Sequence, residues 1–482
     1  MWWHEAVVLQ IYPRSFADAS GDGVGDLEGV RSRLDHLEWL GVDALWLSPI
    51  YRSPMADFGY DVADYRDIDP LFGDLAAFDR LLSDAHARDI RVLLDWVPNH
   101  TSDQHPWFLD ARASRDSPRR DWYRWRDGNG VTPPNDWRAA FDADAPAWTW
   151  DAATEQFYLH TFLPQQPDLN WDNPEVVAAM HDVLRFWLDR GVDGFRADVV
   201  HLIGKDPALP DTGGRDIVSN HDHPGTHALL RGLRGVLEEY PERMMVGEVN
   251  LTETELIAPY ADDGELNLVF DFASLDVPWS TEAWRGRIAH VASVMGDRWP
   301  TWVFSNHDQP RIRTRLGGDE RRARAAAVLL LTLRGTPFLY AGDELGMQDA
   351  VVPPERVVDP GGRDGCRAPI PWTATPDHGW PAEPWLPWPP EPETCNAEAQ
   401  RADATSIAHL HRALLVARHA SPALRAGALR LIDADDDVVA YERTAGDDVR
   451  RVLIRFDGQA PAVPDGWSVE VDGGAAVLLH PA

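Results

Sequence analysis

The sequence predicts an α/β protein built on a closed barrel of eight parallel strands. The chain has 482 residues, 44% of them hydrophobic, which is enough for two or three domains. Short apolar runs recur along it, and most neighbouring runs are separated by an amphipathic segment. Because continuous apolar strands must be covered on both faces, this alternation favours a parallel barrel surrounded by helices.

Eight apolar runs give the predicted barrel strands. Helical periodicity is clearest between the second and third runs, over residues 75–89, and between the third and fourth, over residues 175–191. An open doubly wound sheet is the alternative, but it calls for a Gly-rich phosphate-binding turn after an early strand, and the sequence has none there. The runs occupy residues 7–12, 42–48, 91–97, 192–198, 244–249, 266–272, 301–306 and 336–342.

Two intervals interrupt the alternation of strands and helices, and the C-terminal tail has a different pattern. The first is rich in Trp, Asp, Arg and Pro and predicts a subdomain inserted after the third strand; the second, residues 343–404, is a long excursion after the eighth strand. The tail has short alternating runs typical of an antiparallel β-domain. We therefore expect a barrel over 1–100 and 172–404, an inserted subdomain over 101–171, and a C-terminal β-domain over 405–482.

Composition restricts the partners. The formal net charge of −33 disfavours nucleic acid and anionic membranes. The two cysteines, Cys366 and Cys395, form neither a disulfide framework nor a metal-ligand spacing. No apolar run has the length of a membrane span, and the first residues lack the pattern of a signal peptide. We expect a cytoplasmic protein that binds small neutral substrates, and the oligomeric state stays open.

Acidic residues end several predicted strands, where barrel enzymes carry their catalytic groups. Asp198 ends the fourth strand, Glu248 ends the fifth and Asp308 follows the seventh. A single Asp after a strand is usually a cap or turn residue. Arg196 lies two positions before Asp198, on the same face of the strand, and a neighbouring guanidinium favours an ionised carboxylate. These residues are therefore candidates for catalysis.

Paired carboxylates around a bond are the chemistry of glycoside hydrolysis. An ionised Asp198 suits a nucleophile, and Glu248 in a partly dry site suits a general acid. Asp308 would face the positive charge that develops on the sugar. The distance between the two reacting carboxylates decides between retention and inversion of the anomeric centre.

The ends of these strands resemble the motifs of glycoside hydrolase family 13, the α-amylase family, over about residues 4–400. The resemblance implies a retaining α-glucosidase with Asp198 as nucleophile, Glu248 as acid/base and Asp308 as transition-state stabiliser. QPDLN at 166–170 is similar to the segment of the oligo-1,6-glucosidase branch. The four family motifs are similar to DWVPNH (95–100), GFRAD (194–198), GEVN (247–250) and SNHD (305–308).

The resemblance also implies the residues that hold the terminal glucose. Asp61 and Arg367 are expected to pair at the closed end of the pocket, which makes the enzyme exo-acting. Phe141 and Phe162 are expected either to form its aromatic walls or to be packing residues of the inserted subdomain. The other implied substrate-binding residues are Tyr60, His100, Arg196 and His307.

Val199, which follows the nucleophile, bears on linkage. In the branch that the chain resembles, Val at this position tends to accompany α-1,6 preference, and a single methyl group in a pocket changes discrimination only modestly. The long loop over 200–220 can override it. We expect hydrolysis of short oligosaccharides of the isomaltose and maltose type, with the preference between α-1,6 and α-1,4 open.

Residues 18–27, DASGDGVGDL, imitate the start of an EF-hand loop. The acidic twelfth position of that loop is missing. Similar members of the family carry a structural Ca²⁺ or Mg²⁺ here, and the alternative is an Asp/Gly-rich turn without a metal. We expect a structural, non-catalytic ion and no organic cofactor. The predicted ligands are Asp18, Ser20, Asp22, the carbonyl of Val24, and Asp26.

Two other functions compete with hydrolysis. A transglucosylase of the same family, of the sucrose isomerase or trehalose synthase type, shares every catalytic residue. The segment IRTRLGG at 312–318 lacks the charged run associated with isomaltulose formation, which favours a hydrolase. A non-catalytic relative of the transporter heavy-chain type is disfavoured because all three carboxylates are present.

Overall fold

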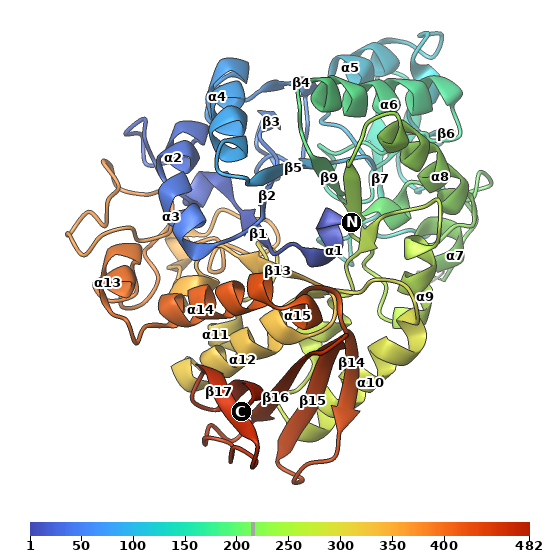
Figure 1. Cartoon of the computed structure of the whole chain (residues 1–482). Helices are drawn as coiled ribbons and strands as arrows, with labels where there is room; N and C mark the ends of the chain where they lie inside the picture. Colours follow the sequence, from blue (N-terminus) through green and yellow to red (C-terminus); the bar gives the residue numbers. More distant parts are fainter. Residues whose placement is uncertain (214–216) are drawn as a thin grey trace.

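The computed structural model describes residues 1–213 and 217–482, and it contains the predicted barrel (Figure 1). Eight parallel strands pair in the order β11-β10-β9-β5-β2-β1-β13-β12. Each predicted run contains one strand, so this prediction is confirmed. Thr301 Oγ1 donates to the carbonyl of Val269 at 2.7 Å, across the seam between β12 and β11. The strands are β1 (Val8–Ile11), β2 (Ala44–Leu47), β5 (Arg91–Trp96), β9 (Gly194–Ala197), β10 (Met244–Gly247), β11 (Leu268–Val269), β12 (Thr301–Val303) and β13 (Thr336–Tyr340).

Helices surround the barrel, and their ends follow local capping rules. Asp74 begins α4 (Leu75–His86) by accepting the N–H of Ala77. Asn173 begins α6 (Pro174–Asp189) by accepting the N–H of Glu175, and a proline occupies the first position of this helix. Apolar residues repeat along one face of each helix and are buried against the sheet. The other large outer helices are α6 (Pro174–Asp189), α8 (Gly225–Glu238), α10 (Thr281–Met295) and α12 (Glu320–Thr332).

The barrel interior is filled rather than hollow. Alternate strand residues point inward and form a cluster around Trp46, which also contacts Phe270 and Phe338. The indole Nε1 of Trp46 donates to Asp95 Oδ2 at 3.1 Å, so this large buried ring has no unpaired polar group. The packed floor leaves the C-terminal ends of the strands as the place for a cavity.

The inserted region contains α5 (Pro106–Ala113) and a small antiparallel sheet in the order β6-β8-β7. Its strands are β6 (Trp125–Asp127), β7 (Trp148–Asp151) and β8 (Gln156–Leu159). Shorter elements line the rest of the chain. They are α1 (Trp2–Glu5), α2 (Leu27–Ser32), α3 (Leu34–Leu40), β3 (Tyr51–Arg52), β4 (Asp64–Ile68), α7 (Ile217–Asn220), α9 (Thr254–Ile257), α11 (Ile312–Arg315) and α13 (Ala397–Ala402).

The C-terminal sheet is antiparallel, as predicted, in the order β14-β15-β16-β18-β17. Its first strand begins at Ala428. The segment before it forms α14 (Ile407–Ala420) and α15 (Pro422–Ala426), and α14 packs on α12 of the barrel. The strands are β14 (Ala428–Ile432), β15 (Val438–Ala445), β16 (Asp448–Arg455), β17 (Trp467–Asp472) and β18 (Ala476–Pro481).

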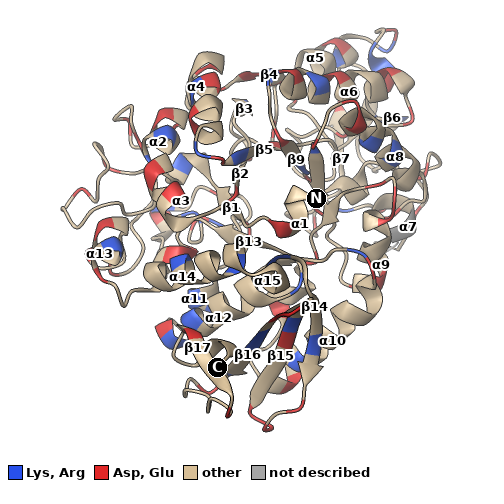
Figure 2. Cartoon of the chain, viewed as in Figure 1, with Lys and Arg blue, Asp and Glu red and all other residues tan. Residues whose placement is uncertain are grey.

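Charged residues lie mainly on the outer helices and on the loops between elements (Figure 2). None of the described helices has both the length and the apolar character of a membrane span.

Lys205 ties the inserted region to the barrel. It is the single lysine of the chain, and its side chain is only 1% exposed. Its Nζ donates to Asn99 Oδ1 at 2.8 Å and to the carbonyl of Leu202 at 2.6 Å, and lies 3.0 Å from Asp168 Oδ2. An ammonium has three N–H donors, so these three acceptors match it fully. The contact joins the loops after β5 and β9 to the end of the inserted region.

Lys205→Met should lower the free energy of unfolding by about 3–5 kcal/mol, because it leaves the Asp168 carboxylate buried without its cation. Urea unfolding measures the change. Arg190→Met is the matched control: its partner Asp79 is half exposed, so this variant should lose less than about 1 kcal/mol. Equal losses in the two variants would contradict a structural role for the buried ammonium.

Candidate active site

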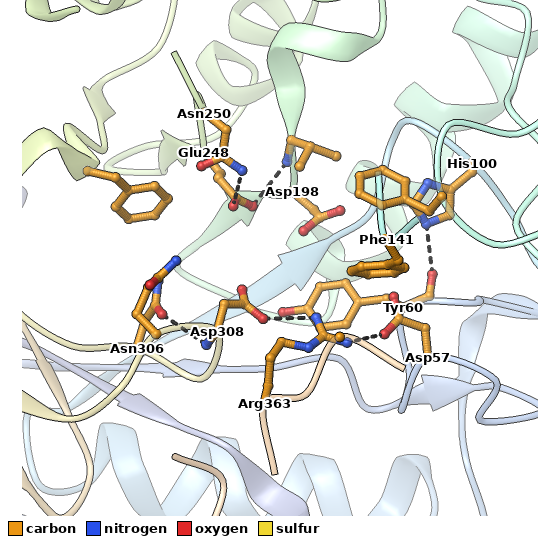
Figure 3. Close-up of a pocket in the computed structure, with 15 residues that line it drawn as sticks. Asp57, Tyr60, His100, Phe141, Asp198, Glu248, Asn250, Asn306, Asp308 and Arg363 are labelled. Atoms are coloured by element: carbon orange, nitrogen blue, oxygen red, sulfur yellow. Dashed lines mark hydrogen bonds and ion pairs between the residues drawn. The ribbon is translucent and has the colours of Figure 1, made fainter. Parts of the chain in front are cut away.

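A cavity of about 260 Å³ lies at the C-terminal ends of the barrel strands (Figure 3). This volume is slightly below the usual range of about 300–1,000 Å³ for small-molecule sites. Loops after β3, β5, β9, β10, β11, β12 and β13 and the inserted region all contribute to its wall. The lining residues are Asp57, Tyr60, His100, Phe141, Phe162, Asp198, Val199, Glu248, Asn250, Phe272, Asn306, Asp308, Gln309, Gly361 and Arg363.

The guanidinium of Arg196 holds the carboxylates together from beneath. It is 1% exposed, and its Nη1 donates to Asp198 Oδ1 at 2.6 Å and to Asp95 Oδ1 at 2.7 Å. Its Nη2 donates to Glu248 Oε2. The nucleophile and acid candidates therefore share one cation. We expected Arg196 to contact the substrate, but it does not line the cavity and acts instead as the common partner of the acids.

The charge balance around Arg196 raises the pKa of Asp198 well above its ordinary value. Burial is the main cause, and the neighbouring Glu248 and Asp95 add to it, whereas Arg196 lowers it. The sequence predicted that Arg196 would favour the ionised form of Asp198; Arg196 does lower the pKa, but burial and the neighbouring acids raise it further. The raised pKa of Asp198 therefore reflects its burial beside two other acids that share Arg196 as their cation.

Glu248 Oε1 has a different neighbour from Glu248 Oε2. Asn250 Nδ2 donates to Oε1 at 2.9 Å, while the backbone N–H of Val199 donates to Oε2 at 3.2 Å. Oε2 already accepts from Arg196, so Oε1 is the oxygen with room for a proton. Figure 3 shows Glu248 and Asn250 on one side of the cavity and Arg363 on the other.

Val199 has a left-handed backbone, with φ 34° and ψ 44°. A β-branched residue is strained in this region, and such strain is typical of functional sites. The conformation turns the chain directly after Asp198, so that the N–H of Val199 points at Glu248 and its side chain lines the cavity. In the loop that follows, residues 214–216 lie outside the described residues.

Asp308 differs from Asp198 in charge. Burial raises its pKa, but His307, Arg363 and Arg367 outweigh burial and bring the pKa below the ordinary value. The Oδ1 of Asp308 lies 3.0 Å from Arg363 Nη1 and 3.1 Å from Arg367 Nη2. It is therefore a permanent negative charge at the cavity wall, as electrostatic stabilisation of a cationic transition state requires.

The expected pairing of Asp61 with Arg367 is wrong. Asp61 is fully buried and accepts the N–H groups of Ala56 and Asp57, so it shapes its own loop. The guanidinium of Arg367 is also buried and lies against Asp359 and the carbonyl of His307.

The acid and arginine that meet in the cavity lie four residues earlier in each segment. Asp57 Oδ1 is 2.6 Å from Arg363 Nη2, and Arg363 also reaches Asp308 (Figure 3). Gln166, from the QPDLN segment, donates to Asp57 Oδ2 at 3.0 Å and lies 3.1 Å from His100 Nε2. The inserted region thus fixes this end of the cavity.

Phe141 and Phe162 both line the cavity, with ring centroids 5.6 Å apart. Phe162 lies 5.2 Å from the His100 ring, and the Arg363 guanidinium lies over Phe141 at 5.0 Å. They form an aromatic wall, and such surfaces suit the weakly polar faces of sugar rings.

His307 lies below the cavity and does not line it. Its ring is fully buried and stacks on that of Tyr60, which is exposed to the cavity. Sequence reasoning also missed several lining residues. Asp57 and Arg363 could have been considered from the sequence, because they are the same residue types as the predicted pair and lie four residues before Asp61 and Arg367. Asn250 and Asn306 lie within the quoted motifs but were given no role, and nothing in the sequence alone pointed to Phe272, Gln309 and Gly361.

The loop over residues 18–26 holds itself together by hydrogen bonds. Asp18 accepts the N–H groups of Gly21 and Gly23, and Asp26 accepts those of Ala19 and Ser20. Asp22 is exposed and turns to the N–H of Val24. In the part of the chain that the structure describes, no three His, Cys, Asp or Glu side chains are arranged as a metal site.

Comparison with known proteins agrees with this geometry. Residues 10–427 match the alpha-amylase catalytic domain. The chain belongs to the alpha-amylase family. An oligo-1,6-glucosidase of Parageobacillus thermoglucosidasius is 38% identical over 96% of this chain and 92% of its own length. Trehalose-6-phosphate hydrolase of Escherichia coli K12 is 40% identical over 86% and 84%, respectively.

Solved structures of the family superpose over the whole chain. The alpha-glucosyl transfer enzyme XgtA has a TM-score of 0.91 at 39% identity, covering 100% of this chain and 98% of its own. The trehalulose synthase MutB from Pseudomonas mesoacidophila has a TM-score of 0.88 at 34% identity, with the same coverage. Family members similar to this chain therefore include a protein named as a hydrolase, one named as an alpha-glucosyl transfer enzyme and one named as a trehalulose synthase.

The corrected pair can be tested with two isosteric variants. Asp57→Asn removes the charge opposite Arg363 and should lower kcat/KM by about tenfold to a hundredfold, as expected for a lost charge-assisted hydrogen bond. Asp61→Asn should lower Tm, because it weakens the acceptor of two backbone N–H groups, and should leave KM within about threefold. A larger rise in KM for Asp61→Asn than for Asp57→Asn would restore the original pairing.

Proposed function

We propose that this protein is a retaining, exo-acting α-glucosidase that removes terminal non-reducing glucose from short oligosaccharides. The observation that carries the proposal is the bridge of Arg196 between Asp198 and Glu248, which lies beneath one end of a cavity whose other end is formed by the Asp57–Arg363 pair. The bridge supplies the reacting carboxylates, and the ion pair supplies a polar end for one sugar.

The two reacting carboxylates, Asp198 and Glu248, take part in both halves of the proposed reaction. Glu248 Oε1 donates its proton to the glycosidic oxygen, and Asp198 attacks the anomeric carbon to form a glucosyl ester. Glu248 then takes a proton from water, which attacks the same carbon and releases glucose with the configuration retained. Asp308 stays ionised and stabilises the positive charge on the sugar ring in both transition states.

Exo-action rests on the ion pair. A carboxylate and a guanidinium within 2.6 Å of each other can each bond a hydroxyl of a terminal glucose. A chain that continued beyond that glucose would have to displace Arg363, which is held by Asp57, Asp308 and Asp359. Short substrates ending in this pocket are therefore favoured over internal bonds of starch.

The uncharged lining residues favour a neutral leaving group. Among the described residues that line the cavity, Arg363 is the one arginine or lysine, and its partners there are acidic. The residues Asn250, Phe272 and Gln309 offer a phosphate no cation. A phosphorylated sugar, as in the name of the Escherichia coli relative, is thus disfavoured. Both α-1,6 and α-1,4 substrates remain within the proposal, and Val199 beside Asp198 favours the former.

Transglucosylation is the second candidate, because solved structures named for glucosyl transfer superpose over the whole chain. The two functions share the glucosyl ester and differ in whether water or a sugar hydroxyl takes the glucose. A cytoplasmic location, expected from the sequence, stays a prediction.

Product analysis tests the proposal. Wild-type protein given isomaltose, maltose, sucrose, trehalose or soluble starch should release glucose fastest from the first two, and NMR should show α-glucose before mutarotation. Asp198→Asn should reduce kcat by several orders of magnitude with the fold intact by circular dichroism. An initial β-anomer would refute retention, a sucrose isomer as main product would favour transfer, and a variant with a tenth of the wild-type rate would refute Asp198.

The structural Ca²⁺ or Mg²⁺ stays a proposal. Carboxylates that accept N–H bonds still have lone pairs, so a cation can be held if Asp22 turns back toward Asp18 and Asp26. We expect Tm to be higher in excess Ca²⁺ than in excess EDTA, since a ligand that prefers the folded state stabilises it by mass action. Asp22→Asn should remove most of that difference. Equal Tm values under both conditions would mean that the loop is a turn without a metal.

A further inference from the structure

A chain of buried hydrogen bonds runs beneath the cavity. Gln10, on β1, is 1% exposed, and its Nε2 lies 2.6 Å from His307 Nδ1 and 3.2 Å from Ser48 Oγ. On the other edge of the imidazole, His307 Nε2 lies 2.5 Å from the hydroxyl of Tyr60. That hydroxyl donates to Asp95 Oδ2 at 3.1 Å.

The direction of this chain follows from counting protons. The hydroxyl of Tyr60 has one proton, and the ionised carboxylate of Asp95 can only accept it. Burial raises the pKa of Asp95 to about 6, which still leaves it ionised at neutral pH. His307 must then supply the proton between its Nε2 and the Tyr60 oxygen.

His307 has one ring proton to place. Burial is the main cause that brings its pKa well below the ordinary value, so the ring stays neutral at neutral pH. A neutral imidazole with a proton on Nε2 has a bare lone pair on Nδ1. The group that faces Nδ1 must be a donor, and the amide Nε2 of Gln10 is one.

We propose that Gln10 is a positioning residue that fixes His307 as its Nε2–H tautomer by donating a hydrogen bond to Nδ1. The reversed amide would place its oxygen against Nδ1 and require the other tautomer. His307 Nε2 would then present a lone pair to Asp308 Oδ2, which lies 3.3 Å away. A carboxylate and a lone pair repel each other, whereas the N–H attracts the carboxylate.

The consequence for activity rests on the proposed function. With its proton on Nε2, His307 directs an N–H toward the Tyr60 hydroxyl and Asp308 Oδ2. Both of these residues line the cavity where the sugar is proposed to bind. Without the donor at Nδ1, the ring can adopt either tautomer, and part of the population opposes the charge of Asp308. Gln10 touches neither the cavity nor the reacting carboxylates, so it acts entirely through the ring.

Neutron diffraction on perdeuterated crystals near neutral pH tests the tautomer directly. The expected result is deuterium on Nε2 of His307, none on Nδ1, and the ND₂ group of Gln10 facing Nδ1. Deuterium on Nδ1, or on both nitrogens, would overturn the proposal. This result does not depend on what the enzyme hydrolyses, so it separates failure of this inference from failure of the proposed function.

Two variants test the effect on catalysis. Gln10→Met removes the donor with little change in volume and should lower kcat/KM by about tenfold to a hundredfold, with most of the loss in kcat. Ser48→Ala is the matched control, because it removes the other partner of the same amide and keeps the contact with Nδ1. It should change kcat/KM by less than about threefold.

Equal losses in the two variants would overturn the catalytic part of the inference. If Gln10→Met does not fold, Gln10→Glu provides the second variant. It replaces the donor by an acceptor, so its neutron structure should show deuterium on Nδ1 of His307. A bare Nδ1 in that variant would also overturn the proposal.

Discussion

One buried guanidinium holds the acidic centre of this molecule together. Arg196 lies on β9 between β5 and β10, and its register neighbours are Asp95 on one side and Val246 on the other. It contacts three carboxylates that would otherwise repel one another in a site of low dielectric. Removal of a buried partner of this kind typically costs more than any surface ion pair contributes, so the cavity as found depends on this residue.

Asp198 and Asp308 are both aspartates at the cavity, but their pKa values shift in opposite directions. Asp198 shares one cation with two other acids and has a raised pKa, whereas Asp308 lies beside two arginines, Arg363 and Arg367, and has a lowered pKa. Neighbours, and not residue type, decide whether the pKa of a buried acid is raised or lowered. The barrel achieves this by sending each group from a different strand end into one small volume.

The sequence was sufficient where physical constraints are local. Eight buried strands require apolar runs, and catalytic groups at the ends of strands follow from barrel geometry, so both were predictable. Asp57 and Asp61 are two acids of one loop, and their roles depend on which carboxylate meets backbone N–H groups and which meets Arg363. That choice is made by tertiary packing. The helices before the final sheet were likewise missed, because α14 owes its place to packing on α12.

The single lysine also determines how the protein responds to chemical reagents. Amine-directed esters, aldehydes and cross-linkers normally react with exposed lysine side chains, and here the only lysine is 1% exposed and fully engaged in hydrogen bonds. Such reagents find no accessible side-chain amine on the folded chain. Attachment to a support or a dye is better directed to the abundant carboxylates of the surface, and uptake of an amine reagent by Lys205 itself would report local unfolding.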